Sequence, residues 1–194
     1  MTRRALLIVV ATALGAGCAS TPPQFYTLSG NGTAAGTAAP ASAAAYSVSV
    51  GPVSVPDIVD RPQFVVRLAA NQVELAEHAR WAEPLKTAIP SVIAENLAHS
   101  LGDARVSASS TDSDYKVLID VQRFESVRGD AVTIDALWSV RPPKGAAARP
   151  GRSVVSEAVA GKDYQGLAAA HSKALAVLSN DIAQAIRAYE VARR

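Results

Sequence analysis

The stretch YKVLIDVQRFESVRGDAVTIDALWSV, residues 115–140, decides the fold of this chain. Apolar and polar residues alternate through both of its halves, which is the period of a half-buried strand. The residues that share a face in each half are Tyr115, Val117, Ile119 and Val121, then Val132, Ile134, Ala136, Trp138 and Val140. The polar connection from Glu125 to Asp130 joins the halves, so the sequence predicts a β-hairpin.

Regular spacing continues on both sides of this hairpin. Short strands are expected at 46–50, 64–68 and 72–76, with a turn at Asn71, and another at 153–160. A helix is expected over 85–101, where Pro84 suits the first turn and Pro90 is expected to kink the helix or reset its start. A final amphipathic helix begins near Asp163, a good N-cap.

The order of these elements is strands, helix, strands, helix. Two amphipathic helices that cover one face of a mainly antiparallel sheet satisfy this order most economically. The sequence therefore predicts a single α+β domain over residues 46–194.

The N-terminus is typical of a secretory signal. Arg3 and Arg4 precede an apolar run at 5–14 and the small residues Gly15-Ala16-Gly17, and the next residue is the only cysteine, Cys18. We expect residues 1–17 to be a lipoprotein signal peptide and Cys18 to be lipidated. The alternative is an ordinary signal peptide cut near residue 13 or 18, because Leu14 stands one position too early for a lipoprotein motif.

A low-complexity segment separates Cys18 from the expected domain. Residues 29–45 are almost wholly Gly, Ala, Ser and Thr, so residues 18–45 are expected to be the lipidated N-terminus and a flexible tether. Phe25, Tyr26 and Leu28 interrupt this composition. They are expected to dock as a short strand either on the domain or on a partner.

Charge and motif content exclude several functions. The chain has 19 Lys and Arg against 17 Asp and Glu, and Arg3 and Arg4 belong to the signal, so the mature chain is neutral. Neutrality argues against nucleic-acid binding, which requires neutralised phosphates. The histidines at 78, 99 and 171 lack metal-ligand spacing, and no nucleophile elbow or phosphate loop occurs. We therefore expect no enzyme activity and no cofactor or metal, and His171 is interpreted as structural.

One carboxylate pair in the predicted hairpin requires attention. If the turn is centred between Val127 and Arg128, Asp120 faces Asp135. Like charges directly opposite are destabilising, although paired carboxylates also serve acid/base catalysis or calcium binding. The alternatives are a register shifted by two residues or an arginine from another element.

Two segments are candidates for partner contact. Trp81 precedes the proline that starts a helix, where a Trp closes the core or anchors an interface. The stretch VSVPDIVDRP, residues 53–62, is a proline-bounded loop with apolar residues. The candidate partner interface consists of Phe25, Tyr26, Pro56, Asp57, Ile58, Arg61 and Trp81.

These segments carry a family resemblance. The stretches GPVSVPDIVDRPQFVVR (51–67) and WAEPL (81–85) resemble the PqiC-like ABC-type transport auxiliary lipoprotein family. Further similar segments are FYTL (25–28), VQRFE (121–125), ALW (136–138), GKDY (161–164) and LSNDIA (178–183). The departures are Ile58, where the family commonly has an aromatic residue, and the weak cleavage site.

The resemblance implies a non-catalytic lipoprotein of the outer membrane that faces the periplasm. It implies a role beside an MCE-domain protein, docking or supporting an intermembrane lipid transport system and envelope integrity. Ala19, in place of the Asp typical of inner-membrane retention, agrees with the outer membrane. An assembly factor for another outer-membrane machine and an envelope hydrolase are the alternatives, and a homo-oligomer remains open.

Overall fold

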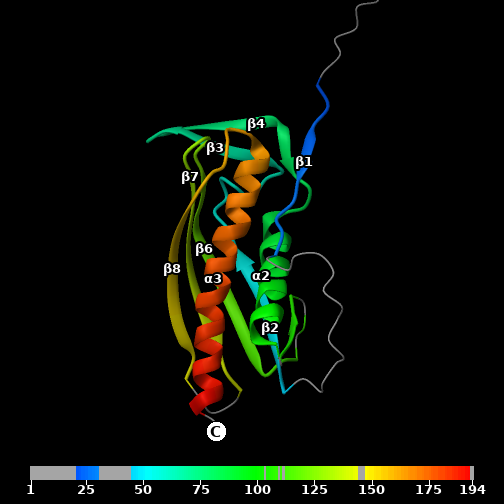
Figure 1. Cartoon of the computed structure of the whole chain (residues 1–194), viewed down its shortest axis with the longest axis vertical. Helices are drawn as coiled ribbons and strands as arrows, with labels where there is room; N and C mark the ends of the chain where they lie inside the picture. The colour runs from blue at the N-terminus through cyan, green and yellow to red at the C-terminus, as the bar shows by residue number, and fades with distance from the viewer. Residues whose placement is uncertain are drawn as a thin grey trace, which may run out of the picture.

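The computed structural model describes residues 21–30, 45–102, 104–108, 110, 112–143 and 147–192. Its strands form two sheets, and two helices pack side by side against the larger one (Figure 1). Cys18, the expected signal at residues 1–17 and the part of the expected tether at 31–44 lie outside the described residues.

The larger sheet has five strands in the order β5-β2-β6-β7-β8. Their bounds are β2 (Tyr46–Ser54), β5 (Ala104–Ser107), β6 (Tyr115–Ser126), β7 (Ala131–Arg141) and β8 (Arg149–Ala158). The predicted hairpin is confirmed as β6 and β7, with a turn at 127–130 where Gly129 has a φ of 72°. The alternating apolar residues of both strands point to the same side, so Val117 pairs with Val140 in the core.

Strand directions in this sheet are mixed, whereas the sequence pattern predicts a mainly antiparallel sheet. Strand β2 runs parallel to both of its neighbours, β5 and β6, while β7 is antiparallel to β6 and β8. Parallel neighbours need a long crossover, which the chain between residues 54 and 104 supplies. Period-two spacing identifies a strand but carries no information on its direction. The α+β class itself is confirmed.

The smaller sheet has three strands in the order β1-β4-β3. Their bounds are β1 (Gln24–Tyr26), β3 (Gln63–Ala69) and β4 (Gln72–Trp81). Strands β3 and β4 form a hairpin around the predicted turn at Asn71. Strand β1 pairs in parallel with the end of β4, and Leu28 just after it is buried. The segment with Phe25, Tyr26 and Leu28 therefore docks on the domain itself and not on a partner. The folded part accordingly begins before Tyr46.

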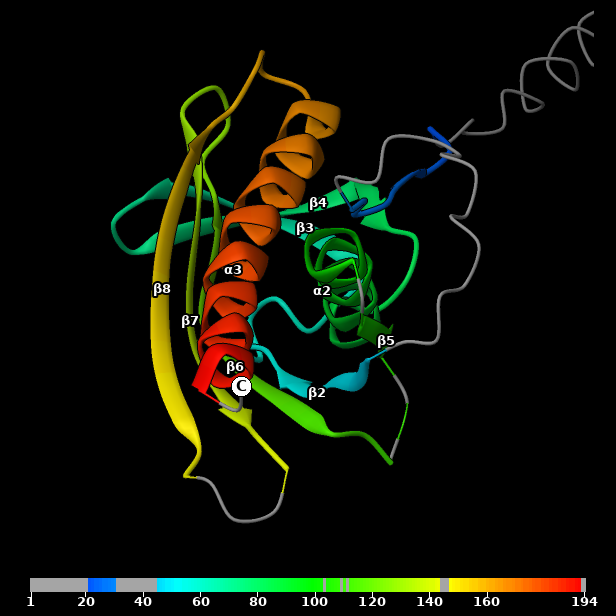
Figure 2. The ribbon, with the colours of Figure 1, turned by 60° about the horizontal axis from the view of Figure 1, so that its bottom comes forward.

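The two helices cover one face of the larger sheet (Figure 2). Helix α2 (Leu85–Leu101) lies on β2 and β5, and α3 (Tyr164–Ala192) lies on β7 and β8. Helix α2 continues through the buried Pro90 as one helix, so the predicted new start does not occur. The predicted N-cap is confirmed, because Asp163 Oδ1 accepts a hydrogen bond of 2.7 Å from the Gly166 N–H.

A cluster of rings joins the two sheets to the first part of α3. We call it the aromatic cluster, and it consists of Tyr26, Phe64, Trp81, Phe124, Tyr164 and His171. Phe64 stacks on Trp81 with ring centroids 3.9 Å apart, and Phe124 stacks on His171 at 3.9 Å. Aromatic pairs add to the stabilisation from burial, so this cluster fixes the smaller sheet on the larger one.

Candidate functional site

The loop between β2 and β3, residues 55–62, is held in place at several points. The Val59 N–H donates to Pro56 O at 3.0 Å, and the Trp81 N–H donates to Pro62 O at 2.6 Å. Asp60 forms an ion pair of 2.6 Å with Lys86 on α2, and the hydrogen bond from this pair raises the pKa of Lys86. A loop with such anchors is preorganised and loses little entropy when a partner binds.

This loop presents apolar and charged side chains to solvent. Val55 and Val59 point into the core, whereas Ile58 is 48% exposed and Asp57 is also exposed. The stretch was predicted to carry contacts rather than core residues, and its two valines instead fix the loop to the domain. Ile58 gains significance from the other apolar residues around it, because contiguous apolar surface, and not a single exposed residue, marks an interaction site.

One side of the loop borders a groove that we call the hairpin groove. Its volume is about 240 Å³, and it is lined by Pro56, Ile58, Val59, Val65, Arg67, Val73 and residues 122–126. Strand pairing puts Val65 opposite Leu75 and Arg67 opposite Val73 on this face of the β3–β4 hairpin. Val73 and Leu75 are 36% and 38% exposed, so the groove and its rim are largely apolar.

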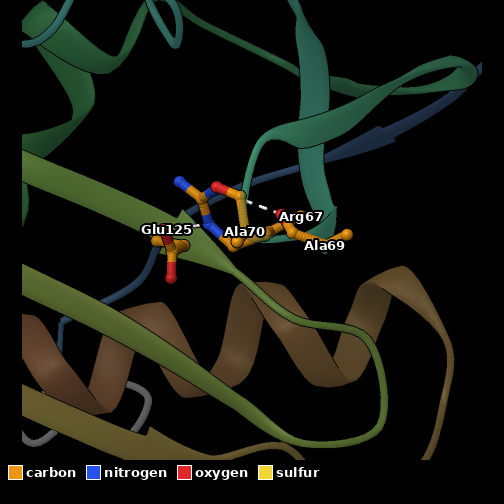
Figure 3. A network of polar contacts seen from close by, with 4 residues as sticks. All are labelled: Arg67, Ala69, Ala70 and Glu125. Atoms are coloured by element: carbon orange, nitrogen blue, oxygen red, sulfur yellow. Dashed lines mark hydrogen bonds and ion pairs between the residues drawn. The ribbon is translucent and has the colours of Figure 1, made fainter.

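The far end of the β3–β4 hairpin is attached to the larger sheet by an ion pair. Arg67 Nε donates to the carboxylate of Glu125 on β6, and its Nη1 donates to Ala70 O at 2.9 Å (Figure 3). The Glu125 side chain is only 19% exposed. The arginine thus contacts both the turn of its own hairpin and the neighbouring strand, at one end of the hairpin groove.

The other side of the loop borders a second hollow, the arginine pocket. Its volume is about 440 Å³, and it is lined by Phe25, residues 60–62 and residues 80–84. Two cations, Arg61 and Arg80, line this pocket, and Phe25 beside Arg80 in the register is 62% exposed. The Arg61 Nε–H is buried and has no hydrogen-bond partner among the described residues.

The remaining two candidate interface residues belong mainly to the core. Trp81 is 6% exposed and stacks on Phe64, as expected of a residue that closes the core. It also lines the arginine pocket. Tyr26 packs edge-on against Phe64 at 5.5 Å. The structure therefore divides the predicted interface between two hollows, with Ile58 and Pro56 in one and Phe25 and Arg61 in the other.

His171 is a structural residue, as predicted. It is fully buried, and its Nε2 lies 2.8 Å from the Ser126 hydroxyl. Burial lowers the pKa of the imidazole to about 3, so it is neutral at physiological pH. Its Nδ1 has no partner among the described residues, and Ser126 is only 3% exposed. A serine–histidine pair without an orienting carboxylate or access to a substrate does not form a nucleophilic site.

The predicted contact between Asp120 and Asp135 is wrong. Asp120 pairs with Leu137, and a bulge at Gln122 then brings Arg123 opposite Asp135. The Asp135 carboxylate accepts two hydrogen bonds, of 2.9 Å and 2.7 Å, from Arg152 on β8. This hydrogen bonding lowers the pKa of Asp135. Both alternatives weighed for the pair apply, since the register is shifted and an arginine intervenes.

In the part of the chain that the structure describes, there is no group of three or more His, Cys, Asp or Glu side chains that would hold a metal ion. None of the described helices is long and apolar enough to cross a membrane.

Sequence reasoning missed the residues that make the hairpin groove. The sequence pattern places Val65 and Val73 in strands without indicating their face, and it does not single out Arg67 and Glu125. A signal was present, because β3 and β4 carry apolar residues at both odd and even positions. The core of the domain requires only one apolar face of the β3–β4 hairpin. The second apolar face is therefore not explained by packing against the core.

Comparisons with known proteins agree with this architecture. A crystal structure of an uncharacterised protein superposes with a TM-score of 0.72 at 20% identity, covering 86% of this chain and 99% of the other. A DUF330 protein from Xanthomonas campestris gives a TM-score of 0.70 at 22% identity, with 88% and 99% covered. Likeness at these identities establishes the fold alone.

The family was tested separately from the fold. No curated protein matches the sequence. The model of the ABC-type transport auxiliary lipoprotein component matches residues 26–183, which include both sheets and most of α3. On this match, the chain belongs to the family of ABC-type transport auxiliary lipoprotein components.

Proposed function

We propose that this protein is a non-catalytic lipoprotein that docks an MCE-type lipid transport system at the outer membrane, facing the periplasm. The family of transport auxiliary lipoproteins supports a role in transport through a partner. The signal-like residues 1–17 and Cys18 support a lipid anchor, and Ala19 supports the outer membrane. The lipid anchor leaves the domain itself free for protein contacts.

The hairpin groove is the observation that carries the docking role. It combines an apolar floor, an exposed Ile58 and an anchored rim, which are the properties of a binding site for an apolar segment of another protein. The Arg67–Glu125 pair fixes the hairpin that forms one side of the groove. The neutral mature chain makes recognition depend on shape and apolar contact more than on charge.

Photo-crosslinking in intact cells tests the proposal. A photoreactive amino acid at Ile58, in the hairpin groove, is compared with the same residue at Val154, which is 59% exposed on β8. We expect crosslinks from position 58 to an MCE-domain protein and none from position 154. Crosslinks from position 58 to components of another outer-membrane machine would favour the assembly-factor alternative instead.

The anchor is tested independently. Mass spectrometry of the mature N-terminus is expected to find acyl chains on Cys18, and Cys18→Ser is expected to release the protein from the membrane fraction. An unmodified thiol after cleavage elsewhere would contradict the lipoprotein assignment at this residue. That result would leave the docking test at Ile58 unaffected.

A further inference from the structure

The arginine pocket lies at the end of the molecule where the chain arrives from Cys18. Strand β1 begins at Gln24 and is fixed on β4, while Leu28 behind it is buried. Gln24 is the sixth residue after Cys18, and six residues of extended chain span about 20 Å. A lipid on Cys18 would therefore keep the start of β1 within about 20 Å of the bilayer, and the pocket borders β1.

The side chains in this pocket are those that bind a phospholipid surface. Arg61 and Arg80 offer guanidinium groups, which bind phosphate oxygens through paired N–H donors. Phe25 projects beside them and is 62% exposed, as expected of an aromatic residue that enters the headgroup region. The neighbouring Pro62 and Pro84 add rigid apolar surface.

Two acidic residues also line the pocket, and their effect is limited. Asp60 is paired with Lys86 at 2.6 Å, so its charge is already balanced. Glu83 is exposed and opposes one of the two arginines. The Arg61 Nε–H is itself buried, so the lipid contact is assigned to the rest of that guanidinium group.

We propose that the arginine pocket is the membrane-facing contact of the domain, where Arg61 and Arg80 bind phospholipid phosphates and Phe25 enters the headgroup layer. The proposal rests on the proposed function only for the anchor at Cys18. A short anchor raises the effective concentration of headgroups at the pocket, so weak binding at each arginine is sufficient. The contact would orient the hairpin groove, on the other side of residues 55–62, toward the periplasm.

The two tryptophans of the chain allow a direct test. Trp81 lines the pocket, whereas Trp138 lies on β7, opposite Gly151 of β8. The chain from Cys18 to Arg194 is coupled through its single thiol to maleimide lipids in vesicles of phosphatidylethanolamine and phosphatidylglycerol. A spin-labelled headgroup lipid then quenches any tryptophan near the surface. Trp138→Phe leaves Trp81 as the reporter, and Trp81→Phe leaves Trp138.

We expect Trp81 to be quenched at least two-fold more than Trp138. The double variant Arg61→Gln/Arg80→Gln is expected to remove this difference, whereas the matched Arg105→Gln/Arg141→Gln, with two exposed arginines elsewhere, is expected to preserve it. Near an anionic surface each arginine strengthens attachment about five-fold, so loss of both is measurable. Circular dichroism of each variant verifies that it is folded.

Two outcomes would overturn the proposal. One is equal quenching of Trp81 and Trp138, and the other is quenching of Trp81 that survives in the Arg61→Gln/Arg80→Gln chain. Inorganic phosphate at 10 mM is added as a further arm, and selective loss of Trp81 quenching would show that free phosphate competes with the lipid phosphate for the same arginines. Because the coupling supplies the anchor chemically, failure of lipidation in cells affects only the proposed function.

Discussion

The two faces of the three-stranded sheet are both apolar, yet only one of them is buried. On one face, Phe64 and Trp81 enter the aromatic cluster and are nearly inaccessible to solvent. On the other face, Val73 and Leu75 remain more than a third exposed beside the hairpin groove. A sheet face that meets only water is ordinarily polar. The difference separates residues that stabilise the domain from residues whose apolar character serves contact with another molecule.

Truncating the buried face is expected to have the largest effect. Trp81→Ala removes a stacked ring from the aromatic cluster and leaves a cavity, so the free energy of unfolding should fall by about 3–5 kcal/mol. Urea denaturation followed by circular dichroism measures this change. Phe25→Ala, which removes an exposed ring from the same sheet, should change stability by less than about 0.5 kcal/mol. Similar losses in the two variants would contradict the division between the faces.

Acid is expected to destabilise the domain through the aromatic cluster, to which His171 belongs. Folded His171 has a pKa of about 3, whereas the unfolded imidazole titrates near 6.5. Between these values the unfolded state binds a proton that the folded state does not, so this contribution is complete above pH 6.5 and is lost as the pH falls toward 3. From pH 7 to pH 4 the loss should be about 3 kcal/mol.

A matched variant isolates the histidine from the carboxylates, which also titrate in this range. His171→Phe/Ser126→Ala replaces both members of the buried pair, so no polar partner is left alone. The free energy of unfolding of this variant should fall less steeply between pH 7 and pH 4. Parallel curves for the two proteins would exclude His171 as a source of acid sensitivity.

The Arg67–Glu125 ion pair, which attaches the β3–β4 hairpin to β6, is expected to make a smaller contribution to the free energy of unfolding. Arg67 and Glu125 are partly exposed, so their coupling in a double-mutant cycle should be at most about 1 kcal/mol. The cycle uses Arg67→Ala, Glu125→Ala and the double variant, each measured by urea denaturation. Crosslinking from Ile58 should decline in all three, because the hairpin loses its attachment to β6. Undiminished crosslinking would mean that the groove keeps its shape without this pair.

Ile58, which lines the hairpin groove, should contribute least to stability and most to partner binding. Ile58→Ser should alter the free energy of unfolding by less than about 0.5 kcal/mol and weaken affinity for the proposed MCE-domain partner at least ten-fold. Affinity is measured as the binding of each purified variant to the partner immobilised on a sensor surface. Val154→Ser, which truncates another exposed apolar residue, on β8, is the control and should bind normally.

The sequence specifies the elements of this fold better than their assembly. Alternation identified β6 and β7, and the spacing of apolar residues identified both helices, because these patterns depend only on neighbours along the chain. It did not reveal that β2 is parallel to β6, which depends on where the crossover returns. It also misplaced Asp120 and Asp135, because the turn is centred at Gly129 and not between Val127 and Arg128, which shifts the pairing of the two strands.

The candidate site was predicted in part for the same reason. Ile58, Arg61 and Phe25 were found because they lie in recognisable loop and aromatic segments. Their division between two hollows was not visible, because it depends on the positions of β1 and the β3–β4 hairpin in space. Trp81 was assigned two alternatives, core and interface, and its burial against Phe64 decides for the core.

The short pairing of β1 with β4 also has a mechanical meaning. Strand β1 pairs with β4 through three residues, and Leu28 behind it is buried. These contacts set the length of chain between Cys18 and the first residue that is fixed on the domain. With β1 in place, that length is six residues, or about 20 Å when extended. If tension on the anchor detached β1 and Leu28, the length to Tyr46 would become 28 residues, or about 90 Å. With Cys18 lipidated, as proposed, strand β1 would therefore determine how far from the membrane the domain can reach.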